Sequence, residues 1–129
     1  MAYYISRTVN HSFDKSIELV TEALAAEGFG VLTEIDVKAT MKKKLDVDFR
    51  NYHILGACNP PFAHKALEAE DKIGTMLPCN VIIQERGENK IEIAAVDPVS
   101  SMQAVDNDAL EPIATEIRDR LERVMNSLS

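Results

Sequence analysis

Hydrophobic and polar residues alternate in several short segments, and this alternation predicts five β-strands. The segment 3–9 is the first, because Tyr3, Ile5 and Val9 share one face while the other face is mostly polar. The segments 31–35 and 52–58 are predicted to be the second and third strands. The last two are 80–86 and 90–96, and Gly87-Glu88-Asn89 between them is typical of a tight hairpin.

Apolar residues at spacings of three and four predict helices between these strands. After Ser12, a suitable N-cap, a helix with one apolar stripe runs to Gly28. A short lysine-rich helix follows Asp36 and ends near Leu45, and another is expected over 62–71. Residues 99–107 are expected to be irregular, and Asp108 with Glu111 has the spacing of a capping box. The stripe of the last helix is Leu110, Ala114, Ile117, Leu121, Val124 and Leu128.

The predicted element order is β-α-β-α-β-α-β-β-α, which indicates an α+β fold. Alternating strands and helices would suit a parallel sheet. However, the tight final hairpin and the short early strands favour a mixed or antiparallel sheet with helices packed on one side. A chain of 129 residues without a linker or repeat is expected to form one domain over residues 1–129.

The charge and composition limit the partners of this chain. Its net charge is −7, and an acidic surface disfavours nucleic acid because phosphates repel it. We expect no membrane segment and no signal peptide, since no apolar run is long enough and the N-terminus lacks the pattern. These expectations indicate the cytoplasm, where the two cysteines would be reduced. Lysines 42–44 indicate a solvated helix face or, alternatively, an anion contact.

The most distinctive residues are the two cysteines and their neighbours. Cys58 closes a predicted buried strand just before a helix, where free backbone N–H groups and the helix dipole would stabilise a thiolate. Cys79 opens another strand, and each cysteine is followed by an asparagine, Asn59 or Asn80. If the two strands are neighbours, both Cys-Asn pairs would lie at one edge of the sheet. With Pro60 at the helix start, these residues are the candidate site.

Two readings of these thiols stay open. Buried free cysteines often pack as small hydrophobic residues. Alternatively, Cys58 and Cys79 form a functional thiol pair, although the spacing is not CxxC. The two cysteines together with a methionine or a histidine, at 53 or 64, could hold a soft metal ion such as Cu(I). Because zinc-site spacing is missing, this signal is weak, and we assign no metal and no cofactor. Asp97, Asp106 and Asp108 are interpreted as turn and cap residues.

Three segments carry a resemblance to a known family. They are GFGVLTEIDVKATMKKKLDVDFRNYHILGACNPPFAHKAL at residues 28–67, IGTMLPCNVIIQE at 73–85 and AAVDP at 94–98. The chain resembles the DUF302 family, a domain of unknown function, over residues 1–128. GACNPP and LPCNV are specific in combination, and neither departs from the pattern.

This resemblance implies a fold and an assembly but no activity. The implied fold is of the TATA-binding-protein-like type, with a curved, mainly antiparallel sheet and a β-α-β(4)-α core. The elements predicted above give that core plus two extra helices. The resemblance also implies a homodimer. A fold of this type does not by itself make a protein bind DNA.

Two functions follow as hypotheses. The first is a dimeric module without catalytic activity that binds a small ligand between the sheet and the long helix, or serves assembly. The second is a thiol-dependent activity, either redox or sulfur transfer. In it, Cys58 would be the nucleophile and Cys79 its partner, while Asn59 and Asn80 would orient the substrate. Whether the chain is an enzyme is left open.

Overall fold

The computed structural model describes residues 2–129 and contains one five-stranded sheet. The strands lie in the order β1-β5-β4-β3-β2, and every neighbouring pair is antiparallel. The antiparallel prediction is therefore confirmed, and the β4–β5 hairpin lies where the glycine-containing turn was expected. The strands are β1 (Tyr4–Val9), β2 (Gly30–Asp36), β3 (Tyr52–Cys58), β4 (Cys79–Gly87) and β5 (Lys90–Val96).

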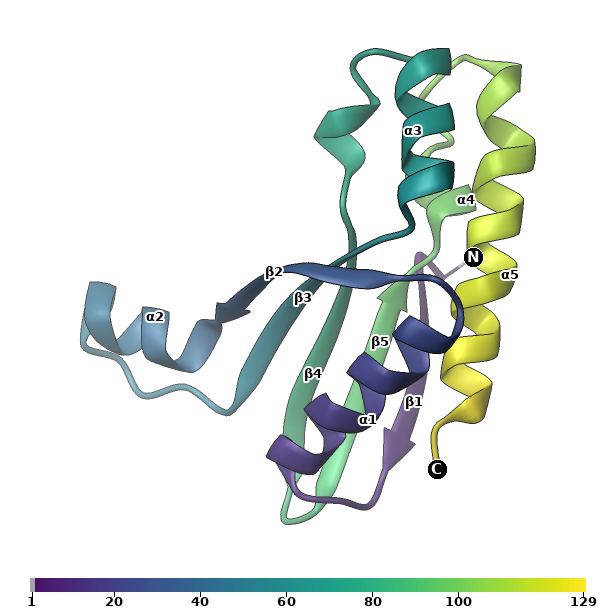
Figure 1. The fold of residues 1–129 in the computed structure, drawn as a ribbon. Helices are drawn as coiled ribbons and strands as arrows, with labels where there is room; N and C mark the ends of the chain where they lie inside the picture. The colour runs from purple at the N-terminus through teal and green to yellow at the C-terminus, as the bar shows by residue number, and fades with distance from the viewer. Residues whose placement is uncertain (1) are drawn as a thin grey trace.

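Two long helices, α1 (Phe13–Ala26) and α5 (Glu111–Ser127), cover one face of this sheet (Figure 1). The two predicted extra helices are α2 (Val37–Leu45), which projects to one side, and α3 (Pro60–Ala69), which stands beside the first half of α5. All but two residues of α2 are exposed, and Lys42 forms ion pairs of 2.9 and 3.6 Å with Asp46 and Asp48. The side chains of this lysine-rich helix therefore face solvent.

The core lies between the sheet and the helices α1 and α5. Side chains alternate along a strand, so every second residue of β4 and β5 points at the helices. The apolar stripes of α1 and α5 meet these residues, as their spacing predicted. The side chains with at most 1% exposure include Val20 and Leu24 of α1, Leu121 and Val124 of α5, and Leu55, Val81, Ile83, Ile91 and Ile93 of the strands.

The ends of α1 agree with the sequence signals. The Ser12 hydroxyl accepts a hydrogen bond of 3.1 Å from the Lys15 backbone N–H, so Ser12 is the N-cap. Gly28 has a φ of +86°, which a glycine adopts without strain. The chain can therefore leave the helix and turn directly into β2.

The segment after β5 is more ordered than expected. Residues 98–101 form a short helix, α4 (Pro98–Ser101), in the stretch predicted to be irregular. The predicted capping box at Asp108 is wrong. A 3₁₀ turn (Asp108–Leu110) precedes α5, and the Asn107 side chain caps this turn by accepting from the Ala109 N–H. Asp108 therefore lies inside the turn and α5 begins without a side-chain cap.

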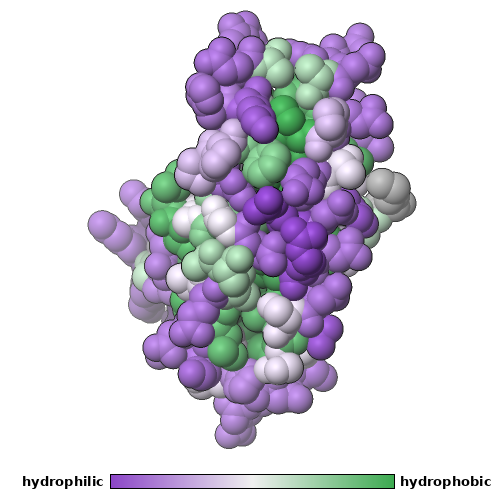
Figure 2. Space-filling model, turned by 45° about the vertical axis from the view of Figure 1, so that its right-hand side comes forward, coloured by the Kyte–Doolittle hydropathy of each residue, from purple (hydrophilic) through white to green (hydrophobic). Residues whose placement is uncertain are grey.

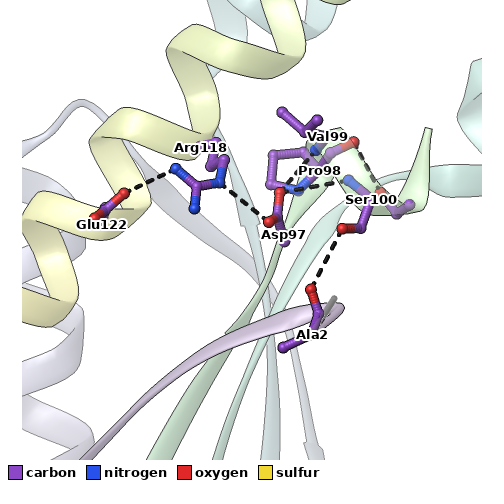
Figure 3. A network of polar contacts seen from close by, with 8 residues as sticks. Ala2, Asp97, Pro98, Val99, Ser100, Arg118 and Glu122 are labelled. Atoms are coloured by element: carbon purple, nitrogen blue, oxygen red, sulfur yellow. Dashed lines mark hydrogen bonds and ion pairs between the residues drawn. The ribbon is translucent and has the colours of Figure 1, made fainter. Parts of the chain in front are cut away.

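Asp97 joins α4 to α5, as Figure 3 shows. Its carboxylate accepts hydrogen bonds from the Val99 and Ser100 N–H groups, at 3.0 and 3.4 Å. It also accepts from Arg118 Nε at 3.1 Å, and this hydrogen bond raises the pKa of the Arg118 guanidinium. Arg118 in turn pairs with Glu122 at 2.9 Å. The interpretation of Asp97 as a cap residue is confirmed.

Within residues 2–129, no helix has the length and apolar character that crossing a membrane requires.

Candidate functional site

A cavity of about 320 Å³ lies at the end of the sheet where β3 stops and β4 begins. Helix α3 forms one wall and the first half of α5 another, so the cavity occupies the upper part of the molecule in Figure 1. The 3₁₀ turn (Ile73–Met76) and the residues leading into β4 complete it. The cavity therefore depends on the extra helix α3 as well as on the sheet.

The wall of this cavity is almost entirely apolar. Two rings, Phe29 and Phe62, face it together with Ile117 of α5. Leu32 and Leu67 are 68% and 44% exposed, so the cavity reaches the surface beside them. Figure 2 shows hydrophobic residues in the upper part of the molecule, bounded by hydrophilic ones. The other apolar lining residues are Ala57, Ala63, Ala66, Gly74, Leu77, Pro78, Pro98, Met102, Ile113 and Ala114.

Both predicted thiols line this one cavity. Strands β3 and β4 are neighbours, and Cys79 lies opposite Ala57, the residue before Cys58. Both thiols are free. Segments 21 residues apart thus converge at the end of the sheet where β3 stops and β4 begins, because their strands are neighbours.

The two thiols differ in environment. Cys79 is 8% exposed, and burial, followed by repulsion from Cys58, raises the pKa of its thiol to about 11. Cys79 is therefore neutral at physiological pH and behaves as an apolar wall residue. Cys58 is only partly buried, so solvent and small reagents reach it more readily.

The start of α3 provides fewer hydrogen-bond donors than expected for Cys58. Pro60 and Pro61 occupy the first two positions of the helix. Proline has no backbone N–H, so two of the donors that are usually free at a helix start are missing here. The helix dipole remains, but the N–H contribution to thiolate stabilisation is reduced.

Asn59 lies beside the thiols and is 6% exposed. It precedes α3, but its side chain makes no capping hydrogen bond to that helix. Its Nδ2 instead donates to the Glu27 carbonyl at the end of α1, at 3.3 Å, because the buried carboxamide points at that helix end. Arg120 Nη1 donates to the same carbonyl at 3.1 Å. Asn59 therefore fixes α1 against β3 while its side chain borders the cavity.

Asn80 and Pro60 are placed apart from the thiols. Asn80 is exposed and follows Cys79, so its side chain points to the opposite face of the sheet, where it helps to line a second hollow. Pro60 is exposed at the start of α3 and does not line the cavity. The structure thus brings together two thiols and one carboxamide rather than two of each.

The histidines of the weak metal hypothesis have other partners. His53 Nδ1 lies 2.8 Å from Glu34, and its ring stacks edge-to-face on Phe13. His64 Nε2 lies 3.2 Å from Glu68 one turn along α3. Among residues 2–129, no three His, Cys, Asp or Glu side chains gather in a way that could hold a metal ion.

Sequence reasoning missed the residues that form most of the cavity wall. Phe62 and Ile113 sit on helices, and Met102 follows α4. The Phe62 ring makes cation–π contacts with two side chains: Arg120 Cζ lies 5.1 Å and Lys65 Nζ 5.2 Å from its ring centre. The only sequence signal for these wall residues was that the α3 segment carries apolar residues outside the main core. Such a pattern does not reveal that the residues enclose a cavity.

Comparison with known proteins gives a consistent family. The family "Domain of unknown function DUF302" matches residues 5–128. One solved structure is described as an uncharacterized conserved protein DUF302 from Bacillus stearothermophilus. It is 27% identical with a TM-score of 0.92, and the alignment covers 100% of both chains. No curated protein matches the chain. A fold match over the whole length together with the family match leaves no ambiguity: the chain belongs to the DUF302 family.

Proposed function

We propose that the chain is a small-ligand-binding module that works as a homodimer, and that its ligand is a small, mainly apolar molecule held in the cavity between the sheet end, α3 and α5. One observation carries this proposal: a cavity of about 320 Å³ with an almost wholly apolar wall. Ligand sites in proteins are typically concave and apolar, with a few polar groups, and begin at roughly 300 Å³.

The polar groups at the cavity can orient a bound ligand, but they are poorly suited to recognising a charged one. Cys58 and Asn59 are polar side chains of the wall, but they differ in access: Cys58 is partly buried, whereas Asn59 is 6% exposed and its Nδ2 is bound to the Glu27 carbonyl. A ligand would gain about 0.8 kcal/mol for each CH₂ group that it removes from water. An uncharged ring or short chain with one hydrogen-bonding group therefore matches this wall best.

A thermal-shift screen tests this proposal. Naphthol, indole and decanol should raise the melting temperature of the wild-type chain in a saturable way. In Ala63→Leu, the added carbons fill the cavity from α3, so the shift should be lost while the fold is kept. Ala25→Leu, on the exposed side of α1, is the matched control and should respond like wild type. An equal response of all three proteins would refute binding in this cavity.

A second candidate function is thiol chemistry at Cys58. The observation that favours it is the partly exposed Cys58 thiol in the wall of an apolar cavity, with Cys79 also lining it. A reducing compartment such as the cytoplasm, which the sequence predicts, would keep both thiols free. The second function predicts rapid alkylation of Cys58 by iodoacetamide below pH 7, measured by mass spectrometry. Alkylation only above about pH 8.5, as for an ordinary thiol, would rule it out.

A further inference from the structure

Asn59 supplies the strong hydrogen-bond acceptor among the side chains that line the cavity. Among the lining side chains within residues 2–129, the other polar atoms are the sulfurs of Cys58, Cys79 and Met102, and sulfur accepts hydrogen bonds only weakly. Asn59 is 6% exposed, so its carboxamide is more than nine-tenths buried. The hydrogen-bonding capacity that this carboxamide has left over therefore decides which polar group a ligand can bring.

The nitrogen of the Asn59 carboxamide is paired, whereas its oxygen is not. Nδ2 donates to the Glu27 carbonyl at 3.3 Å, and because a carbonyl can only accept, the atom that faces Glu27 must be the nitrogen. A Cβ on Gly28 would lie 3.1 Å from the same nitrogen, so the NH₂ group packs against the turn that follows α1. Within residues 2–129, Asn59 Oδ1 accepts no hydrogen bond.

The unpaired oxygen is open to the cavity. No side-chain oxygen or nitrogen within residues 2–129 is both fully enclosed and without a hydrogen-bond partner, so Oδ1 keeps contact with open space. The oxygen and the nitrogen of a carboxamide point in different directions, and Oδ1 is therefore turned away from Glu27. Since Asn59 forms part of the cavity wall, a ligand in the cavity can reach this oxygen.

The size and the lining of the cavity suit a molecule with two fused aromatic rings. An apolar protein cavity of about 150 Å³ holds one benzene molecule, and this cavity has a volume of about 320 Å³. Phe29 and Phe62 line it, and aromatic rings pack favourably on one another in offset or edge-to-face arrangements. Met102 adds a thioether, which also contacts aromatic rings favourably.

We infer that the cavity selects a flat aromatic molecule with a hydroxyl or ring N–H group, and that this group donates its hydrogen to Asn59 Oδ1. The inference rests on the proposed function and adds the class of ligand and the residue that selects it. A ligand of the same shape without a donor would leave the oxygen buried and unpaired, which lowers its affinity by about tenfold or more.

Fluorescence titration with 2-naphthol and 2-methylnaphthalene tests this inference, because a methyl group is close in size to a hydroxyl but donates no hydrogen bond. The two compounds also differ in hydrophobicity. Their ratio of Kd values is therefore compared with the ratio of their partition coefficients from water into cyclohexane, a solvent that accepts no hydrogen bond. With wild type, 2-naphthol should bind at least about tenfold more tightly than the cyclohexane ratio predicts.

The possible failures separate the two proposals. A Kd ratio equal to the cyclohexane ratio would overturn the hydrogen bond to Asn59 and leave the apolar binding site intact. Failure of both compounds to bind would refute the proposed function and this inference together.

Two variants assign the preference for 2-naphthol to one side chain. Asn59→Leu removes the acceptor at similar size, and its Kd ratio should fall to the cyclohexane value. The preference should persist in Cys58→Ala, at whatever affinity the two compounds then have. A preference that survives in Asn59→Leu, or is lost in Cys58→Ala, would overturn the inference. If circular dichroism shows that Asn59→Leu does not fold, Cys58→Ala and Cys79→Ala decide: a preference kept in both supports Asn59, and a loss in either contradicts it.

Discussion

Close packing around Gly56 determines how near two segments of the chain approach each other beside the cavity. Gly56 of β3 has Thr33 on one side and Pro78 on the other. A Cβ at residue 56 would clash with the Thr33 hydroxyl and lie 2.7 Å from Pro78 Cγ. Pro78 also lines the cavity, so the absence of a side chain at Gly56 lets the segment before β4 approach β3 closely.

We expect Gly56→Ala to lower the free energy of unfolding by about 1–3 kcal/mol, because Thr33 and Pro78 must move to admit the new methyl group. Gly30→Ala is the matched control, since a Cβ there has no neighbour within 4 Å. Urea unfolding of both variants measures the difference. A loss in Gly30→Ala as large as that in Gly56→Ala would show that close approach is not the cause.

The Cys79 thiol gives the stability a pH dependence. Its pKa is raised from 9.0 to about 11 in the folded protein, so the folded state keeps the proton after the unfolded chain has lost it. Its contribution is therefore complete below pH 9 and declines as the pH rises toward 11. The expected loss between about pH 8 and about pH 10.5 is on the order of 2 kcal/mol.

Lysines and tyrosines titrate in the same range, so the measurement is a comparison. Urea unfolding of Cys79→Ala should show a shallower decline with pH than wild type. Cys58→Ala removes the second cause of the shift and should keep most of the decline, since burial is the larger cause. Parallel curves for wild type and Cys79→Ala would contradict this account of the buried thiol.

At the scale of elements, stability differs between the helices because their burial differs. Five residues of α5 are buried, namely Ala114, Ile117, Leu121, Val124 and Met125, whereas α2 buries none. Helical stability in proteins comes mostly from packing of an apolar face. The first half of α5 also supports the cavity, and Asp97 fixes α4 to the middle of α5.

Replacing Asp97 should loosen this end of the molecule. Asp97→Ala removes the cap of α4 and the partner of Arg118, and the cap alone accounts for a loss of about 1–2 kcal/mol. Asp97→Asn keeps an oxygen for the Val99 N–H and should lose less. Thermal unfolding measures both, with Asp119→Ala on the exposed side of α5 as control. An equal loss in the Asn and Ala variants would show that the cap contributes nothing.

Hydrogen exchange should distinguish α2 from α5. Because α2 has no buried residue, its amide protons should exchange far faster than those of α5 around Leu121. Mass spectrometry of deuterium uptake measures both. Protection of α2 equal to that of α5 would show that another surface covers α2, against the description of a solvated lysine face.

At the scale of the whole molecule, the sequence predicted the fold well. Alternation of apolar and polar residues identified all five strands, and the final hairpin with the short early strands indicated a mixed or antiparallel sheet with helices on one side, which is antiparallel throughout. The helix α4 was missed because its start depends on Asp97, a buried residue that also pairs with a distant arginine. The cap at Asn107 was missed because Asp108 and Glu111 have the spacing of a capping box. In the structure Asp108 lies inside a 3₁₀ turn, and Asn107 caps that turn.

The candidate site was predicted only in part. Cys58 and Cys79 converge because their strands are neighbours, which the order of elements indicated. Asn80 lies elsewhere because successive residues of a strand point to opposite faces. The cavity itself arises from packing of α3, α5 and the residues before β4, and no local pattern in the sequence reports the space left between packed elements.

Methyl-detected NMR during titration with naphthol tests the proposed cavity most directly. The account predicts saturable shifts of the methyl signals of Ile113, Ile117 and Met102, which line the cavity. It predicts no shift of the signals of Ile54 and Ile82, which lie on the sheet face opposite α1 and α5. Shifts confined to Ile54 and Ile82, or no shift at any of these methyl groups, would contradict a ligand site at the end of the sheet.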